Sequence, residues 1–237
     1  MTKSRFADAL TEGRLIKRYK RFLADIRLTN GDVVTAHCAN PGSMKGLLPE
    51  NGRVALSPNT NKSAKLDWRW EMVEVDGTFV GINTVRANPF VEDMLGDKTI
   101  SELAGYDSIR REVKYGEGSR IDFLLTDSKA VLPDCYVEVK SVTLREGATA
   151  LFPDSVTARG TKHLKELADM VARGHRAVML YLVQRDDCTD FAIADHIDPK
   201  YGAAFQAAQA AGVEAIVAEA HLDVEGITFK RFLSFKG

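Results

Sequence analysis

Two acidic residues and a lysine near the middle of the chain have types and spacing that suit chemistry on a phosphate. Asp122 lies in a β-like segment at residues 120–125, and Glu138 and Lys140 lie in another at residues 135–142. Because side chains alternate between the faces of a strand, Glu138 and Lys140 share a face, which Asp122 joins if the segments pair as a hairpin. Two carboxylates beside a lysine are what a divalent cation and a polarised water need.

The same three residues have a second interpretation. An aspartate, a glutamate and a lysine on one face of a hairpin are often a cross-strand ion pair on a solvated surface. Spacing alone does not separate the surface ion pair from the metal site.

Longer stretches favour the metal site, because they resemble known families. An aspartate followed by Glu-x-Lys on the next strand resembles the active-site signature of the PD-(D/E)XK phosphodiesterases, which share the restriction-endonuclease-like fold. The stretches EVKYGEGSRIDFLL, CYVEVKSVTL and FPDSVTARGTKHLKEL are similar to the sugar fermentation stimulation protein A (SfsA) family. LIKRYKRFLADIRL and HCANPGSMKG, closer to the N-terminus, also resemble that family, so the resemblance covers nearly the whole chain.

The PD-(D/E)XK resemblance implies a role for each residue of the signature. Asp122 and Glu138, together with the backbone carbonyl of Val139, would bind Mg²⁺ or Mn²⁺ as a cofactor. Lys140 would orient the attacking water or help to deprotonate it, and would offset negative charge in the transition state.

Glu102, Glu112 and Lys114 are charged residues that lie outside the Asp122, Glu138 and Lys140 signature. Superfamily members often have an extra acid on their first helix, and Glu102 is in that position. However, the sequence Thr-Ile-Ser-Glu that ends at Glu102 is also a capping box, and both interpretations stay open. A second Glu-Val-Lys has no aspartate on a preceding strand, so its Glu112 and Lys114 are predicted to be surface residues.

Clusters of basic residues predict where DNA would bind. Residues 1–30 contain eight basic and three acidic side chains, whereas the whole chain has a net charge of −1. The predicted phosphate contacts in this stretch are Lys17, Arg18, Lys20 and Arg21. A second group surrounds the predicted start of a helix, where free N–H groups favour an anion. Its members are Arg159, Lys162 and His163.

The order of the elements predicts two domains with a boundary near residue 86. Residues 1–86 contain short β-like segments broken by turns such as Asn-Gly-Asp at residues 30–32, which suits an oligonucleotide-binding (OB) barrel. The SfsA resemblance implies the same fold. A short helix is predicted at residues 43–48. Trp68, Trp70 and Tyr19 are expected either to stack on bases or to pack in the barrel.

The order of elements in residues 87–237 predicts an α/β domain with a mixed sheet, as in the restriction-endonuclease-like fold. Helices are predicted at residues 88–95, 99–104, 161–173 and 199–211, the third with leucines at helical spacing. Strands are predicted at residues 110–115, 120–125, 135–142, 176–184, 213–220 and 225–232.

Composition indicates a protein of the reducing cytoplasm. The three cysteines are far apart in the sequence, so neither disulfides nor a zinc site is expected. The first residues have no apolar core typical of a signal peptide, and no apolar run is long enough to span a bilayer.

The SfsA resemblance implies DNA binding without strong sequence preference and a regulatory role in sugar (maltose) metabolism. The retained Asp122, Glu138 and Lys140 favour a competent metal site. The alternative is an active metal-dependent nuclease that acts on a particular DNA structure. The sequence leaves the choice open.

Overall fold

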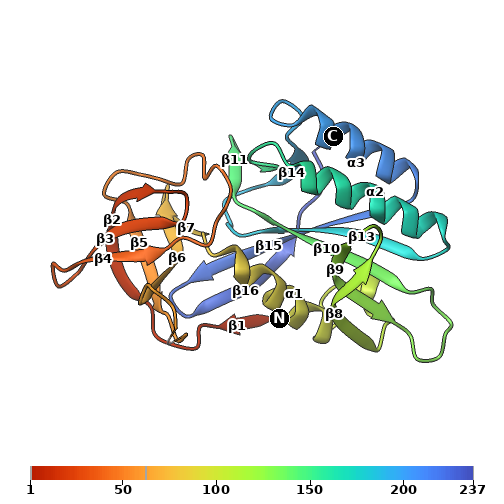
Figure 1. The fold of residues 1–237 in the computed structure, drawn as a ribbon, viewed down its shortest axis with the longest axis horizontal. Coiled ribbons are helices and arrows are strands. Elements are labelled where there is room, and N and C mark those ends of the chain that lie inside the picture. The colour runs from red at the N-terminus through yellow and green to blue at the C-terminus, as the bar shows by residue number, and fades with distance from the viewer. Residues whose placement is uncertain (1, 62, 237) are drawn as a thin grey trace.

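The N-terminal part of the chain forms a small closed barrel. The computed structural model describes residues 2–61 and 63–236. One sheet has the order β4-β3-β2-β5-β6-β7, and a further pairing of β4 with β6 closes its first five strands (Figure 1). These strands are β2 (Thr11–Tyr19), β3 (Leu23–Leu28), β4 (Val33–His37), β5 (Arg53–Pro58), β6 (Trp68–Val75) and β7 (Thr78–Gly81). The OB-like barrel expected from the sequence is confirmed.

Turn chemistry and apolar side chains explain the barrel. The turn between β6 and β7 has positive φ at Asp76 (53°) and Gly77 (79°), as a tight hairpin requires. Trp70 is fully buried in the barrel core, and its indole N–H donates to the Met72 carbonyl at 2.9 Å. Trp70 therefore packs, and it is not available to stack on a base.

The C-terminal part contains a seven-stranded mixed sheet of order β1-β16-β15-β13-β10-β9-β8. Its three central strands, β15, β13 and β10, are parallel, and the outer ones pair antiparallel. The strands are β1 (Lys3–Arg5), β8 (Ser108–Tyr115), β9 (Ser119–Thr126), β10 (Cys135–Val142), β13 (Arg176–Val183), β15 (Glu214–Asp223) and β16 (Gly226–Phe232).

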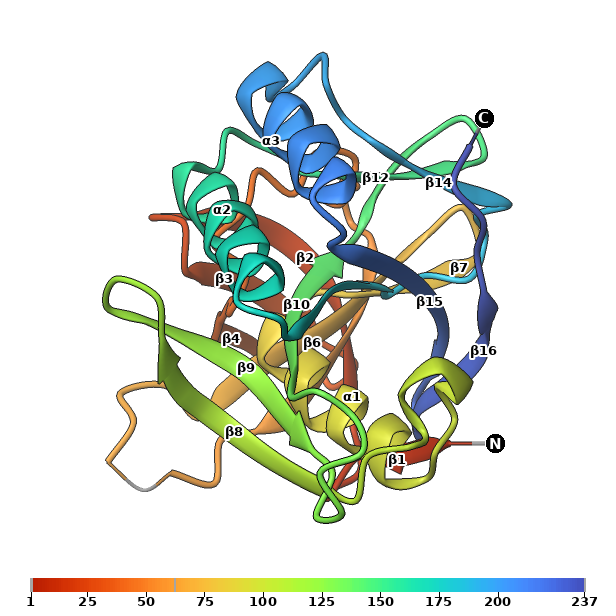
Figure 2. The same cartoon turned by 90° about the vertical axis from the view of Figure 1, so that its right-hand side faces the viewer.

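Helices cover both faces of this sheet. On one face α1 (Ala87–Gly96) packs with apolar residues such as Phe123 and Val137. On the opposite face α2 (Ala158–Ala172) and α3 (Pro199–Ala210) pack against Met179 and Tyr181 (Figures 1 and 2). The central strand β13 is buried almost throughout, which explains its continuous apolar sequence. The predicted α/β class and mixed sheet are confirmed.

Some elements differ from the sequence-based expectation. The helix predicted at residues 43–48 is wrong, because Met44 (φ 54°) and Gly46 (φ 76°) have left-handed backbone angles in an irregular loop. A second sheet of three short strands was not predicted, namely β11 (Leu144–Glu146), β12 (Thr149–Phe152) and β14 (Asp190–Ile193). Strand β1 joins the C-terminal sheet through β16, although its residues precede the barrel.

Specific contacts fix the barrel against the α/β domain. Ser43 donates to the Asp154 carbonyl at 2.8 Å, and the Met44 N–H donates to Asp154 Oδ2 at 3.2 Å. A Cβ at Gly42 would lie 2.3 Å from Asp154 Oδ2, so this approach needs glycine. The loop adopts its irregular shape because it makes these contacts, which explains the missing helix.

A buried carboxylate joins the barrel to the start of α1. Glu71, on β6, accepts hydrogen bonds from Ser57 at 2.6 Å and from Asn83 at 3.0 Å. It also accepts two bonds from the Arg86 guanidinium, at 2.7 and 3.0 Å. The Glu71 side chain is only 1% exposed, so its charge depends on these partners.

Replacing Glu71 by alanine tests this junction. We expect the Glu71→Ala variant to lose about 3 kcal/mol of unfolding free energy, because Arg86 and two polar groups lose their partner. Glu74→Ala, on the same strand, removes a partly exposed pair with Arg53 and should cost about 0.5 kcal/mol. Urea denaturation measures both changes. Equal losses would show that the Glu71 network does not fix the junction.

Candidate metal and nucleic-acid site

Strands β9 and β10 separate at Asp122. Their ladder pairs Leu125 with Cys135 and ends at the pair of Phe123 with Val137. Beyond that pair, Asp122 Oδ2 accepts a hydrogen bond from the Val139 N–H at 2.8 Å in place of a strand partner. Its other oxygen accepts from Asn88 of α1, also at 2.8 Å. Asp122 thus lies in the opening between the two strands.

Glu138 and Lys140 lie on the face of β10 that α2 covers, as strand alternation predicted. Lys140 Nζ is 2.5 Å from Glu138 Oε1. His163, on α2, also contacts this oxygen through Nδ1. Arg159 Nε donates to His163 Nε2 at 3.3 Å, so the imidazole proton is on Nδ1 and is donated to Glu138.

The two carboxylates differ in their electrostatic environment. Burial, and then the charge of Glu138, raise the pKa of Asp122 above the ordinary value. Burial also acts to raise the pKa of Glu138, but His163 and Lys140 outweigh it and lower that pKa. Glu138 is therefore ionised at neutral pH, and at Asp122 the hydrogen bonds from Asn88 and Val139 and the charge of Lys140 do not fully offset burial and the charge of Glu138.

Unpartnered oxygens surround this pair of carboxylates. Glu138 Oε2 is buried without a hydrogen-bond partner, and so are Glu166 Oε2 and the Tyr115 hydroxyl. Burial, followed by the charges of Glu138, Glu166 and Asp122, raises the pKa of Tyr115. An interior that leaves carboxylate oxygens unpaired attracts a cation.

The donor set fits a hard divalent cation. Across residues 2–61 and 63–236, no group of three or more His, Cys, Asp or Glu side chains is arranged to hold a metal. The expected site has only two carboxylates, Asp122 and Glu138, and completes its set with a backbone carbonyl. Oxygen donors of this kind suit Mg²⁺ or Mn²⁺, and Glu138 Oε2 has no competing partner within the described chain.

Basic residues of α2 lie next to the carboxylates. A cavity of about 380 Å³ is lined by the basic residues Arg120, Arg159 and Lys162, by His163 and by the acidic Glu112. Lys162 donates to the Glu117 carbonyl at 2.8 Å, and Arg159 is exposed. His163 is 3% exposed with both ring nitrogens engaged, so it can affect a phosphate only through Arg159.

The four basic residues of the barrel that were predicted to contact phosphates differ in their surroundings. Arg18 donates to the carbonyls of Asn40 at 3.0 Å and Gly42 at 3.3 Å, which fixes the loop that meets the α/β domain. Lys17 lies 3.6 Å from an Asp25 oxygen. Lys20 and Arg21 are exposed on a turn. These two are the cations of the set that are placed to meet a phosphate.

Glu102 lies away from the two carboxylates. It is in η2 (Ser101–Leu103), a 3₁₀ turn whose N-cap is Ile100 and has no side-chain cap, so the predicted capping box and longer helix are wrong. The Glu102 carbonyl accepts a hydrogen bond from Arg176. Arg176 is the β13 partner of Cys135, the first residue of β10, whereas Lys140 lies near the other end of that strand. Glu112 and Lys114 are exposed on β8, as predicted.

Asn88, Tyr115 and Glu166 belong to this site but were not predicted. Each comes from a different element and is separated by many residues from the Glu-x-Lys strand. The partner of Asp122, Asn88, follows the first residue of α1, and only the packing of that helix against the sheet brings it there. No spacing rule in the sequence identifies such long-range neighbours.

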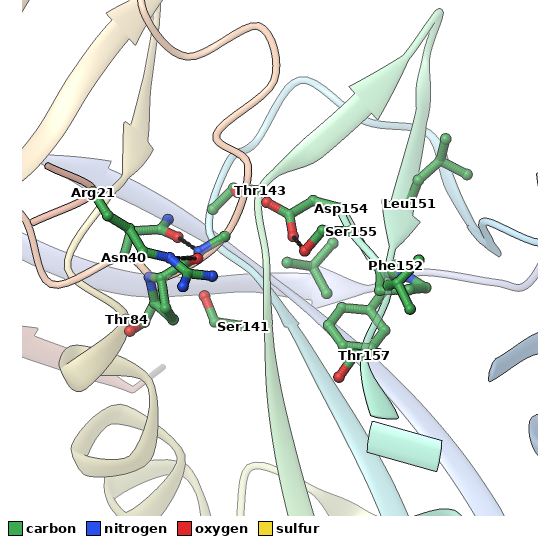
Figure 3. Close-up of a pocket in the computed structure, with 15 residues that line it drawn as sticks. Arg21, Asn40, Thr84, Ser141, Thr143, Leu151, Phe152, Asp154, Ser155 and Thr157 are labelled. Carbon is green, nitrogen blue, oxygen red and sulfur yellow. Dashed lines mark hydrogen bonds between the residues drawn. The ribbon is translucent and has the colours of Figure 1, made fainter. Parts of the chain in front are cut away.

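A cavity of about 320 Å³ lies between the barrel and the α/β domain (Figure 3). Arg21, Asn40 and Thr84 line it on the barrel side. Ser141 and Thr143, at the end of β10, line the other side with the loop that leads to α2 (Figure 3). Thr157, at the start of α2, also lines the cavity and lies two residues before Arg159 of the candidate site.

Comparison with known proteins identifies both halves of the chain. A family model described as the SfsA N-terminal OB domain matches residues 16–82. A second, described as the sugar fermentation stimulation protein RE domain, matches residues 85–226. The chain belongs to the SfsA family. The resemblance of its longer motifs to the SfsA family is thereby confirmed.

Curated and solved SfsA proteins are similar along the whole chain. The sugar fermentation stimulation protein homolog of Ruegeria sp. (strain TM1040) is 56% identical over 225 residues, which cover 94% of this chain and 96% of that protein. The homolog of Paramagnetospirillum magneticum is 53% identical over 223 residues, 94% of each chain. The structure of Pyrococcus furiosus SfsA in complex with Ca²⁺ has a TM-score of 0.90 and 26% identity, covering 100% of this chain and 99% of that one.

No helix among the described residues of this SfsA protein is long and apolar enough to span a membrane. The three cysteines, Cys38, Cys135 and Cys188, are buried and free.

Burial of Asp122, together with the charge of Glu138, predicts an unusual effect of removing the Asp122 charge. Because the pKa of Asp122 is raised, its ionisation opposes folding at neutral pH, and this penalty disappears as the pH falls towards the ordinary value of 3.8. Asp122→Asn should therefore raise the melting temperature by a few degrees at pH 7.5 in metal-free buffer. The gain should shrink as the pH is lowered.

Thermal melts with a chelator over a range of pH measure this effect. Asp93→Asn removes an exposed carboxylate of α1 and serves as the control, with no expected change. If Asp122→Asn were less stable than the wild type at pH 7.5, the hydrogen bonds of Asp122 would outweigh the cost of its burial and of the Glu138 charge.

Proposed function

We propose that this SfsA-family protein binds DNA without strong sequence preference and hydrolyses its phosphodiester bonds with Mg²⁺ or Mn²⁺. One observation carries the proposal: buried Glu138 has an oxygen without a partner among the described residues, and burial and the charge of Glu138 disfavour the charged form of nearby Asp122. The SfsA of Pyrococcus furiosus was solved in complex with Ca²⁺, another hard cation that prefers oxygen ligands. We place the activity in the cytoplasm, where buried cysteines stay reduced.

Asp122, Glu138 and the Val139 carbonyl would hold the cation. When bound, it would supply positive charge that polarises a phosphate oxygen and makes a water more acidic. The positions of both carboxylates are fixed before any ligand arrives, Asp122 by Asn88 and Glu138 by His163. Such preorganisation is what a catalytic site needs.

Lys140 and Arg159 would act on the phosphate. Lys140 Nζ, now 2.5 Å from Glu138 Oε1, would bond to the attacked phosphate. Arg159 and Lys162, at the start of α2, would contact the neighbouring phosphates. Arg159 also holds His163 in the tautomer that donates to Glu138, so phosphate binding and the carboxylate site are linked.

DNA binding follows from the same surfaces. The exposed cations lie on the barrel turn at Lys20 and Arg21 and on α2, on the two sides of the cavity between the domains. Cations that meet phosphates without a helix that reads bases give affinity with little sequence preference.

A second function is favoured by a different observation. Both oxygens of Asp122 accept hydrogen bonds, from Asn88 and from the Val139 N–H, and Lys140 is engaged by Glu138. A site satisfied by its own residues suits a DNA-binding protein that does not cleave. Its relatives are named for sugar fermentation stimulation, and this form would act as a regulator of sugar (maltose) metabolism.

A cleavage assay separates the two functions. Labelled single-stranded, duplex and branched DNA are incubated with and without Mn²⁺. We expect cleavage of at least one substrate with Mn²⁺ only. Asp122→Asn, Glu138→Gln and Lys140→Ala should each lower the rate by about 100-fold or more, since each removes charge stabilisation at the phosphate.

Lys114→Ala is the matched control for this assay, because Lys114 ends the exposed Glu-Val-Lys of β8. It should cleave like the wild type. DNA binding without cleavage under any of these conditions would support the non-catalytic function. Cleavage that persists in Asp122→Asn and Glu138→Gln would place the active site elsewhere.

A further inference from the structure

The cavity between the domains has the size and lining of a nucleotide-binding pocket. Its volume of about 320 Å³ is at the lower end of the range of roughly 300–1,000 Å³ for small-ligand pockets. Hydroxyl groups are prominent in its lining, and they come from Thr84, Ser141, Thr143, Ser155 and Thr157. Apolar surface is supplied by Val142, Leu151 and Phe152. This combination suits a base and its sugar.

Arg21 gives the pocket a cation on the barrel side. Its Nε donates to the Pro41 carbonyl at 2.9 Å, which orients the guanidinium and leaves its other N–H groups for a ligand. The same loop is held by Arg18 through the carbonyls of Asn40 and Gly42. This wall is therefore fixed before a ligand binds.

The Asp154 carboxylate, which lines the pocket, already accepts hydrogen bonds from the protein. Asp154 accepts bonds from Ser43, from the Met44 N–H and from Ser155, the last at 3.2 Å. Its charge is thus used to hold the barrel in place and opposes a phosphate less. Thr143 is only 7% exposed, and no hydrogen bond joins its hydroxyl to another described residue. That hydroxyl is available to a bound sugar or base.

The pocket continues from the candidate metal site. Thr157, the N-cap of α2, lines the pocket and precedes Arg159 by two residues. A strand whose phosphate is bound by Arg159 at the start of α2 would therefore have a neighbouring nucleotide at the mouth of the pocket. A pocket of this volume holds one nucleotide, whereas a base pair brings a second base and backbone.

We propose that the cavity between the domains binds one unpaired nucleotide of the bound DNA strand, so that the protein prefers single-stranded or frayed DNA over duplex. The inference rests on the proposed DNA-binding function and names its substrate class. Enzymes and binding proteins that place a nucleotide in a pocket either use single strands or pay to unpair the base.

Fluorescence anisotropy in a chelator, with no divalent metal present, tests the pocket. The probes are a 15-nucleotide oligo(dT) and a 15-base-pair duplex. The wild type should bind the single strand about tenfold more tightly, the scale of one sequestered base. Thr143→Val should weaken single-strand binding about fivefold and leave duplex binding unchanged, whereas Arg21→Gln should weaken single-strand binding about fivefold more than it weakens duplex binding.

Lys20→Gln is the matched control, because Lys20 neighbours Arg21 on the same turn but does not line the pocket. It should weaken binding to both probes equally. Thermal melts show that each variant is folded. Thymidine 5′-monophosphate should also compete with oligo(dT) for the wild type and compete less well for Arg21→Gln.

Two results would overturn the proposed nucleotide pocket and leave the proposed DNA binding intact. One is equal affinity of the wild type for the two probes, and the other is an equal loss of affinity for both probes in Arg21→Gln. Binding of neither probe would overturn the DNA-binding function and the pocket together. A failure of metal binding or cleavage does not affect this result, because the experiment contains no metal.

Discussion

The structure of the site depends on one buried charge, that of Glu138. A carboxylate that is 3% exposed cannot stay ionised without partners, and here Lys140 and His163 both contact the same oxygen. Its other oxygen has no partner among the described residues, and Asp122 lies close enough for the two charges to repel. A site built to attract a cation needs this unequal arrangement, because full internal neutralisation would leave nothing for the cation to bind.

The fold supplies these partners from opposite directions. Asp122 lies in the opening between β9 and β10 and accepts a hydrogen bond from Asn88 of α1, while Glu138 contacts His163 of α2. The barrel adds a third direction, since its loop is held against Asp154 and forms a wall of the cavity that reaches the start of α2 at Thr157. A carboxylate pair, a basic helix start and a pocket therefore meet at one end of β10, and each depends on the packing of a different element.

Local patterns in the sequence predicted much of this structure. Alternating segments and turn residues predicted the barrel and the sheet, and the spacing of Glu138 and Lys140 placed both on the face that α2 covers. Contacts between distant residues could not be predicted. Asn88 is 34 residues from Asp122, and Ser43 is 111 residues from Asp154. That last contact removed the helix expected at residues 43–48, because the loop satisfies its polar groups against the other domain.

Calorimetric titration of Mn²⁺ into the metal-free protein tests the central claim most directly. The account predicts binding by the wild type, its loss in Asp122→Asn and Glu138→Gln, and its survival in Lys140→Ala, where removal of a positive charge leaves the carboxylates more attractive to a cation. A surface ion pair would give no such asymmetry. If the wild type binds no Mn²⁺ at millimolar concentration, Asp122 and Glu138 are not a metal site.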